Sequence, residues 1–444
     1  MSLPASELRA HARAIWDAAV AAVDPEILVR DALTNPAPAL RAALASAERI
    51  LVVGAGKAGT TMAAGAEGAL LGLLDRVSGI VNVPAESVRP LQTIRLHAAR
   101  PAGINFPTAE GVAGTRQMLA LLASAGPNDV ALCLLSGGGS ALLPAPAEGV
   151  SLEDKQQVTR LLHACGATIN EMNCVRKHLS AVKGGRLAQV FSGKALFSLI
   201  ISDVIGDPLD VIASGPTAAD PTTFTDGRAV LQKYHLTPQV PASVLRHLEE
   251  GAAGRVPETL KALPANIHNI VLGNNARSLA AATRQAEQLG YRVLNLGSFI
   301  EGETRHVATV LAGLVRSIRA DGVPLAPPVC LLSGGETTVT LSEHHGLGGR
   351  NQEVVLAAAL KLGEDALRDV ILLSGGTDGE DGPTDAAGAL ADVGTLRSAL
   401  SLGLDAGTFL ARHDAYHFFA AAGDLLKSGL TGTNVMDVRV ILIH

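Results

Sequence analysis

The chain has 444 residues, a formal net charge of -6, and hydrophobic and aromatic fractions of 48% and 3%. This length favours two domains, and a composition rich in Ala, Leu and Val but poor in aromatics is typical of layered α/β proteins. The acidic balance and the lack of a long Lys/Arg run argue against a nucleic-acid partner. No apolar run approaches the ~20 residues of a membrane span and no signal-like segment is visible, so we expect no membrane partner and a cytoplasmic location.

The first part of the chain is expected to form a parallel sheet covered by helices on both faces. Residues 5–23 have the periodicity of a helix. Short, continuously apolar runs then alternate with helical segments, which is the pattern of strands buried on both faces. These runs are "ILVVG" at 50–54, "SGIVNV" at 78–83, "DVALCLL" at 129–135 and "ALFSLII" at 195–201. We therefore predict a doubly wound, Rossmann-like first domain over residues 1–240.

A second α/β series follows a stretch between 207 and 264 that is richer in Pro, Thr and Asp. Its apolar runs are "NIVLG" at 269–273, "YRVLNLG" at 291–297, "PVCLLSGG" at 328–335, "VILLSGG" at 370–376 and "DVRVILIH" at 437–444. They predict a second α/β domain over residues 241–444. Because ligands bind beyond the carboxyl ends of parallel strands, we expect the active site in a cleft between the two domains.

The turn after the first apolar run, "GAGKAG", carries glycines at 54, 56 and 59 that match the GxGxxG fingerprint. A nicotinamide-dependent dehydrogenase would use such a turn for the pyrophosphate. Lys57 in the middle of the turn is either a solvated lysine beside a dinucleotide or a cation that meets a phosphate. No obvious hydride-transfer constellation accompanies the turn, whereas phosphoryl transfer needs anion-binding loops, a cation and acidic ligands for Mg²⁺.

The pattern Leu-Leu-Ser-Gly-Gly occurs three times, each time at the end of an apolar run. Glycine there allows either a sharp turn into a helix or a close approach of backbone N–H groups to a bound oxyanion. With the turn around Lys57, the repetition favours nucleotide or phosphate binding. The predicted phosphate-binding residues are Gly54, Gly56, Ser136, Gly137, Gly138, Gly139, Ser140, Ser333, Gly334, Gly335, Glu336, Gly375 and Gly376.

Acidic and basic side chains also follow the predicted strands. Asp203, Asp207 and Asp378 have the oxygen ligands that Mg²⁺ prefers, whereas turn chemistry accounts for Glu380 and Asp381. Arg350 follows two glycines and begins an apolar helix, so its guanidinium and the first N–H groups of that helix could face one anion. Arg176, Lys177, Lys183 and Arg186 have the spacing of a solvated face, although Arg176 or Lys183 could reach the cleft.

The ordered set "GAGKAG", "LLSGGGSALL", "NCVRKHLSAVKGGRLA", "SDVIGDPLDVIASGPT", "LLSGGETTV", "GGRNQE", "GGTDGEDGPTDAAGA" and "TGTNVMDV" resembles the class II glycerate 2-kinase family. That family joins a glycerate kinase N-terminal region to a MOFRL module, here at about 325–440. The resemblance implies phosphorylation of D-glycerate at the 2-hydroxyl by ATP with Mg²⁺, giving 2-phosphoglycerate and ADP. It also implies catalytic roles for Lys57 and Arg350.

Some members of this family carry the label hydroxypyruvate reductase, so an NAD(P)H-dependent reductase is the alternative. The chain also departs from the family pattern. The segment "LHAARPAGINFPTAEG" at 96–111 lacks the expected acidic residue, Leu347 replaces a common basic residue, and Leu430 replaces a usual proline. An acceptor other than plain D-glycerate therefore stays open, as does a homodimer.

Overall fold

A computed structural model describes residues 3–101, 104 and 106–444 of the chain. The chain divides into two compact units, Pro25–Leu272 and a second unit made of Met1–Asp24 with Gly273–His444. This division differs from the boundary after residue 240 that the sequence suggested. A strand at Ile267–Gly273 completes the first sheet, and the N-terminal helix Ala5–Ala21 packs on the second sheet. The apolar stripe of that helix shows that one face is buried, but it carries no information on which sheet covers that face.

The unit Pro25–Leu272 is built on a six-stranded sheet of order β3-β2-β1-β4-β5-β6. The pairs β3/β2, β2/β1, β1/β4 and β4/β5 are all parallel. Because the strand order reverses between β1 and β4, their carboxyl ends form the switch point where ligands bind in such folds. The strands are β1 (Ile50–Ala55), β2 (Val77–Pro84), β3 (Ile94–Arg100), β4 (Val130–Leu135), β5 (Ala195–Ile201) and β6 (Ile267–Gly273).

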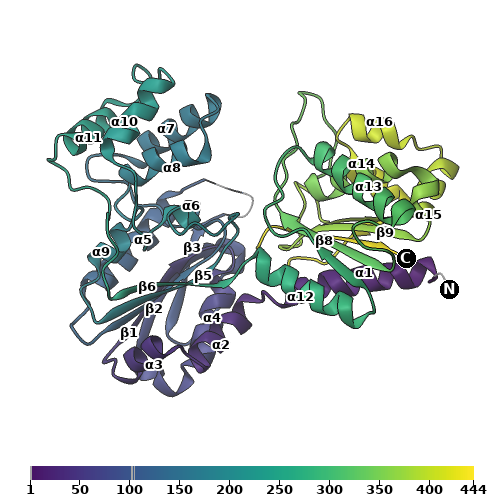
Figure 1. Ribbon diagram of the computed structural model, residues 1–444. Coiled ribbons are helices and arrows are strands. Elements are labelled where there is room, and N and C mark those ends of the chain that lie inside the picture. Colours follow the sequence, from purple (N-terminus) through teal and green to yellow (C-terminus); the bar gives the residue numbers. More distant parts are fainter. Residues whose placement is uncertain (1–2, 102–103, 105) are drawn as a thin grey trace. The chain divides into compact units, whose positions relative to one another are not determined.

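Helices cover both faces of this sheet, which confirms the predicted doubly wound architecture (Figure 1). On one face Met118 and Leu122 of α5 (Ala109–Ala123) share a core with Leu51 and Val53 of β1. On the other face lies α4 (Gly59–Ala69), where a Cβ at Gly59 would lie 2.9 Å from Val83 and 3.0 Å from Val81. Further helices are α2 (Pro25–Thr34), α3 (Pro38–Ala45), α6 (Gly139–Leu142) and α9 (Arg186–Val190).

Four more helices of this unit form a separate helical layer with its own apolar core (Figure 1, upper part of that unit). They are α7 (Leu152–Ala164), α8 (Ile169–His178), α10 (Phe224–Lys233) and α11 (Ala242–Ala252). Side chains of all four helices meet in this core, including Val158, Val175, Phe224 and Leu248. The polar stretch between 207 and 264 therefore belongs mainly to this layer, and it is not a linker between domains.

The second unit has a mixed six-stranded sheet of order β11-β10-β9-β12-β8-β7. The last strand, β12, is inserted antiparallel between β8 and β9, β10 is antiparallel to β9 and β11, and β7 is parallel to β8. The two predicted α/β domains are thus confirmed. The strands are β7 (Arg292–Asn295), β8 (Val329–Gly335), β9 (Val370–Gly376), β10 (Gly388–Ala391), β11 (Leu425–Leu426) and β12 (Asp437–Ile443).

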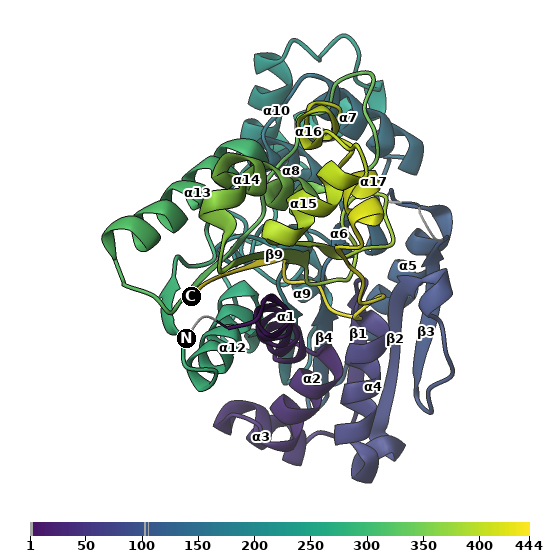
Figure 2. The same cartoon turned by 90° about the vertical axis from the view of Figure 1, so that its right-hand side faces the viewer.

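Figure 2 shows this sheet edge-on, with helices on both of its faces. On one face, α1 (Ala5–Ala21) and α12 (Asn275–Gln288) pack Trp16 and Leu279 against Leu332, Leu373 and Val440. The other face carries α13 (Thr304–Asp321), α14 (Arg350–Leu367), α15 (Val393–Ser401), α16 (Ala406–Ala411) and α17 (Ala415–Ala422). Among the described residues, no helix is both long and apolar enough to span a membrane.

Candidate functional site

The turn that carries Lys57 is fastened to the turn after β4. The Lys57 N–H donates to the Gly137 carbonyl at 2.8 Å, and the Ala58 N–H donates to Oγ of Ser136 at 3.1 Å. The two turns leave adjacent parallel strands at the switch point of the sheet, so hydrogen bonds fix their relative position. The Lys57 side chain is exposed, and Gly138 lies beside it, since a Cβ at Gly138 would be 3.4 Å from Cγ of Lys57.

Packing inside the protein accounts for all three glycines of the fingerprint. A Cβ at Gly54 would lie 2.2 Å from the Leu134 carbonyl oxygen, and one at Gly56 would lie 2.0 Å from Oγ of Ser136. Gly59 lets α4 approach β2, as described above. Gly54 and Gly56 therefore allow β1 and its turn to lie close to β4 and its turn. Their predicted contact with phosphate stays a prediction.

Ser140, at the end of the first Ser-Gly-Gly-Gly-Ser segment, accepts hydrogen bonds from two cations. Its Oγ lies 2.7 Å from Nζ of Lys183 and 2.9 Å from NH2 of Arg176. The same Oγ lies 2.7 Å from Oγ of Ser214, which is 3.3 Å from Oδ1 of Asn173. Because both cations can only donate, the Ser140 hydroxyl hydrogen points to Ser214, and the Ser214 hydroxyl donates to Asn173. Every hydroxyl of this network thus has a fixed direction.

The backbone is strained at Ser214, which belongs to this network, and at the preceding Ala213. Both have positive φ angles, 50° and 62°, although neither is glycine. A Cβ at Gly139 would lie 2.9 Å from Cβ of Ala213, so the two turns are in tight contact. Backbone strain of this kind costs of order 1–3 kcal/mol per residue and gathers at functional sites. It therefore supports a functional role for the Ser140 network.

A cavity of about 430 Å³ lies over this network. Lys155, Arg160 and His163 of α7, Arg176 of α8, and Lys183 contribute basic side chains to it, and no Asp or Glu among the residues that the structure describes lines it. Burial, together with the charges of Arg176, Lys155 and Lys177, holds the pKa of Lys183 well below its usual value. The cavity is therefore a cationic pocket beside the switch point, which suits an anion. We call it the Ser140 pocket.

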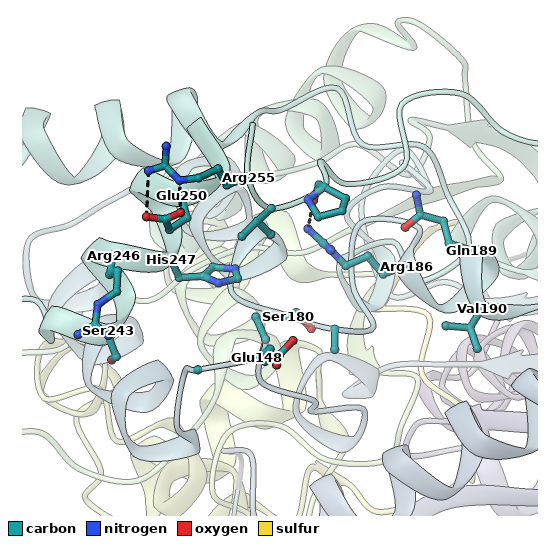
Figure 3. A pocket seen from close by; sticks show the side chains of 15 residues that line it. Glu148, Ser180, Arg186, Gln189, Val190, Ser243, Arg246, His247, Glu250 and Arg255 are labelled. Atoms are coloured by element: carbon teal, nitrogen blue, oxygen red, sulfur yellow. Dashed lines mark hydrogen bonds and ion pairs between the residues drawn. The ribbon is translucent and has the colours of Figure 1, made fainter. Parts of the chain in front are cut away.

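A larger cavity of about 600 Å³ lies between α9, α11 and the loops at 147–149, 180–181 and 255–257 (Figure 3). Arginines also line this cavity, but two of them have an interaction partner within the protein. Arg255 forms an ion pair with Glu250, and Arg186 donates to the Pro257 carbonyl at 2.9 Å. Glu148 adds a further negative charge to the lining. Two glutamates in the lining make this cavity a weaker candidate for an anion than the Ser140 pocket.

In the second unit, two carboxylates bind the guanidinium of Arg350. Asp437 accepts from its Nε at 2.8 Å and from its NH2 at 2.9 Å, and Glu336 lies 2.9 Å from its NH1. Burial alone would lower the pKa of Arg350, but Asp437 and Glu336 raise it above its usual value. Arg439, which is buried, also donates to Asp437 at 3.1 Å. Arg350 is therefore a permanently charged group held in a fixed orientation.

The start of α14 is not open to an anion, which corrects one expectation from the sequence. The N–H groups of Asn351 and Gln352 donate to the carboxylate of Asp381 at 3.0 and 2.8 Å. Asp381 is thus a buried cap of the helix on which Arg350 sits, and more than a turn residue. Burial raises its pKa to about 7, despite those two N–H donors. The guanidinium of Arg350, not the helix terminus, is what this helix offers to a ligand.

The second and third Ser-Gly-Gly segments use several of their N–H groups within the protein. The N–H of Gly334 donates to Gly297, that of Gly335 to Oδ1 of Asn275, and that of Gly376 to Ala387. Gly375 lies inside β9, where the indole N–H of Trp16 donates to its carbonyl at 3.3 Å. Because these N–H groups are engaged, the two segments are not open nests for an anion. Ser333 is buried in β8.

The acidic candidates divide between the two units. Asp203 and Asp207 lie in the loop after β5 and are partly exposed. Asp378 follows β9, and its Oδ1 accepts from the Glu380 N–H at 3.2 Å in its own turn. Among the described residues, no group of three or more His, Cys, Asp or Glu side chains is placed to hold a metal ion. Two carboxylates in one loop still fit the oxygen chemistry of Mg²⁺, which keeps several waters and takes phosphate oxygens as ligands.

Each unit thus brings together part of the predicted set. Lys57, Gly137 to Gly139, Ser140 and the Asp203 loop follow β1, β4 and β5 of the first sheet, and Glu336, Arg350 and Asp378 belong to the second unit. Sequence reasoning missed Lys155 and Asp437. Residues 102, 103 and 105 of the unusual 96–111 segment lie outside the described residues, so its role in acceptor binding stays a prediction.

Comparison with known proteins covers both parts of the chain. Residues 11–249 match the family described as Domain of unknown function (DUF4147), and residues 329–437 match the MOFRL family. The glycerate 2-kinase of Pyrococcus horikoshii is 40% identical over 395 residues, 89% of this chain and 87% of that protein. An Agrobacterium vitis protein provisionally named hydroxypyruvate reductase is 40% identical over 437 residues, 97% of this chain and 93% of that protein.

A solved structure agrees with these matches. The crystal structure titled glycerate kinase from Thermotoga maritima has a TM-score of 0.87 and 36% identity, and it covers 99% of this chain and 100% of that one. The ordered motifs, the two family matches and the full-length structural likeness all point the same way. The chain belongs to the class II glycerate 2-kinase family, which joins a DUF4147 region to a MOFRL module.

Proposed function

We propose that this protein phosphorylates D-glycerate at its 2-hydroxyl, using ATP as the phosphoryl donor. The observation that carries the proposal is its likeness to glycerate kinases over nearly the whole chain in both sequence and structure. In the reaction, the 2-oxygen of D-glycerate forms a bond to the γ-phosphorus of ATP while the bond from that phosphorus to the bridging oxygen breaks. The hydroxyl proton is released, and 2-phosphoglycerate and ADP are the products.

Lys57 is proposed as a catalytic cation of this reaction. It is exposed at the switch point of the first sheet, and hydrogen bonds hold its turn to the turn after β4. A flexible ammonium on a fixed turn can follow the negative charge of the transferring phosphoryl group. Such a group stabilises charge in the transition state without taking part in covalent chemistry.

Arg350 is the second proposed catalytic cation. Asp437 fixes the plane of its guanidinium, and Glu336 holds its other side. The preset orientation reduces the entropy lost when the guanidinium contacts a phosphate or carboxylate. Binding of ATP and of D-glycerate to an Arg350→Lys variant, measured separately, assigns which of the two ligands the guanidinium contacts.

For Mg²⁺ we propose Asp203 and Asp207 as the ligands of the first unit and Asp378 as the acidic candidate of the second. A bound Mg²⁺ would neutralise charge on the phosphate oxygens of ATP. Asp203 follows β5, next to β4 in the sheet, so its loop leaves the same edge as the Ser140 segment. A homodimer and a cytoplasmic location stay predictions from the sequence.

One experiment separates the kinase from the reductase alternative that the Agrobacterium vitis name suggests. The protein is mixed with D-glycerate and ATP·Mg²⁺, and ³¹P NMR follows the products. In parallel it is mixed with hydroxypyruvate and NADH or NADPH, and the nicotinamide absorbance is followed. We expect a 2-phosphoglycerate signal and an equal amount of ADP, with no loss of nicotinamide absorbance. Oxidation of NAD(P)H without phosphate transfer would contradict the proposal.

A further inference from the structure

The amino group of Lys155, on α7, has no hydrogen-bond acceptor among the described residues. Its Nζ is buried and has no hydrogen-bond partner, and the whole residue is 5% exposed. Lysines that are this buried almost always have a partner, because removing an ammonium from water is costly. The side chain lines the Ser140 pocket, where Arg160 and Arg176 can only donate hydrogen bonds.

The charges around Lys155 come from α7, α8 and the turn after α8. Arg160 and His163 lie on the same helix, Arg176 comes from α8, and Lys183 follows α8. No acidic side chain of the described residues lines the pocket. Lys177, by contrast, is neutralised by Asp210 at 2.9 Å and Asp220 at 3.3 Å. The fold therefore neutralises the neighbouring Lys177 with two carboxylates, whereas none of the described residues brings a negative charge into the pocket itself.

We propose that the Ser140 pocket binds a phosphate group of a substrate or product, with Lys155, Arg176 and Lys183 as its cationic ligands. This inference rests on the proposed kinase function. A carboxylate carries one charge and is matched by one arginine, whereas a phosphate carries up to two charges and has oxygens on several sides. Three convergent cations and the Ser140 hydroxyl suit the phosphate. The phosphate belongs either to the nucleotide or to the phosphorylated acceptor.

The protonation of Lys155 gives this pocket a distinctive signature. Burial, helped by the charge of Arg176, lowers the pKa of Lys155 to about 7 in the ligand-free protein. A bound phosphate favours the charged ammonium and raises that pKa. At pH 8 the free protein therefore holds Lys155 mostly neutral, and the charging of Lys155 on binding contributes close to one proton of uptake.

Isothermal titration calorimetry of the full chain tests the proposal with ADP, 2-phosphoglycerate and D-glycerate as separate ligands. Titrations at pH 8 in two buffers of different ionisation enthalpy give the protons taken up. The variants are Lys155→Met, Lys155→Arg and the control Lys361→Met, an exposed lysine on α14 of the second unit. Melting temperature reports whether each variant is folded.

We expect Lys155→Met to weaken either ADP or 2-phosphoglycerate by at least tenfold, and the affected ligand identifies the source of the phosphate. Proton uptake should fall by close to one proton in Lys155→Met and in Lys155→Arg, because a methionine does not titrate and an arginine stays charged. Unchanged affinity for both phosphates, or a loss confined to D-glycerate, would overturn the proposal. If the wild-type protein binds phosphate through Lys155 but transfers none to D-glycerate, the kinase function fails and the pocket assignment stands.

Discussion

Asp437 accepts hydrogen bonds from the guanidinium of Arg350 with both carboxylate oxygens, one at 2.8 Å from Nε and the other at 2.9 Å from NH2. Asp437 is fully buried, at the first position of β12, between β8 and β9. The last strand of the chain therefore sets the orientation of a residue that begins α14. Arg350 is a partly exposed cation whose orientation is set by a carboxylate buried inside the sheet.

This pairing predicts a stability effect of Asp437→Asn. Loss of the charge leaves Arg439, which is buried beside it, without its ionic partner, and it weakens the hold on Arg350. Breaking a buried ion pair on one side costs about 3–5 kcal/mol. We expect a clearly lower melting temperature by calorimetry. Asp365→Asn, at an exposed pair with Arg368, should leave it almost unchanged. Equal melting of both variants would contradict a structural role for Asp437.

Lys57→Met should reduce turnover with D-glycerate and ATP by about 10² to 10³, or roughly 3 to 4 kcal/mol in activation free energy. The methionine keeps most of the aliphatic stem, and the hydrogen bonds that hold the turn come from the backbone of Lys57 and Ala58. The melting temperature should therefore stay close to the wild-type value. A folded variant with near wild-type turnover would remove Lys57 from the catalytic set.

Kinetics can also test whether Lys57 and Arg350 act on one transferring phosphoryl group, which the predicted common cleft requires. Residues that act as a unit show non-additive losses, because the second substitution removes what the first has already disabled. We expect the double variant Lys57→Met, Arg350→Lys to lose less in kcat than the product of the two single losses. Fully multiplicative losses would indicate independent roles.

The sequence predicted most of the sheet strands, though not β3, β10 and β11, and the Ser-Gly-Gly turns, because both are local features. Continuous apolar runs mark strands buried on both faces, and glycines mark the turns that follow. Lys155 could not be found in this way. It lies in "SLEDKQQVTR", which has the composition of a solvated helix, and only the packing of α7 against α8 brings it near Arg176. Local pattern carries no information on such a pairing.

Asp437 was missed, and Asp381 was assigned only a turn role, for a related reason. Asp437 precedes the apolar run of β12 and resembles a polar residue at a strand end, yet β8 and β9 enclose it. Asp381 lies in a glycine-rich turn, where a turn role is the ordinary expectation, but it caps α14 from 30 residues away in sequence. In both cases the partner is distant along the chain.

The metal proposal predicts a shift in the Mg²⁺ requirement. Asp203→Asn removes a charged oxygen ligand and should raise the Mg²⁺ concentration needed for half-maximal turnover, because Mg²⁺ binds carboxylates far better than amides. Asp378→Asn is the parallel variant in the second unit. Turnover is measured over a Mg²⁺ titration at fixed ATP, with melting temperature as the folding control. Unchanged Mg²⁺ dependence in both variants would assign these carboxylates to turn geometry.

Lys155 also predicts a pH-dependent stability in the absence of ligand. Its pKa falls from an ordinary value near 10.5 in the unfolded chain to about 7 in the folded protein. The unfolded chain therefore binds more protons between these two values, so this lysine destabilises the fold increasingly as the pH falls from about 10.5 to 7. Its cost is small above the unfolded pKa and is complete below the folded one.

Lys155→Met removes this titration and keeps the length of the side chain. The variant should melt above the wild-type protein at pH 7, and the difference should shrink as the pH rises to 10. Comparing the two proteins at each pH cancels the titration of the groups that do not interact with Lys155. The charge of Lys155 also lowers the pKa of Lys183, so its removal relieves Lys183 and shifts the difference in the same direction. Calorimetric melting of wild type, Lys155→Met and the control Lys361→Met across this range makes the measurement. A difference that is constant with pH would mean that Lys155 is not desolvated, and the anion pocket would then lose its central charge.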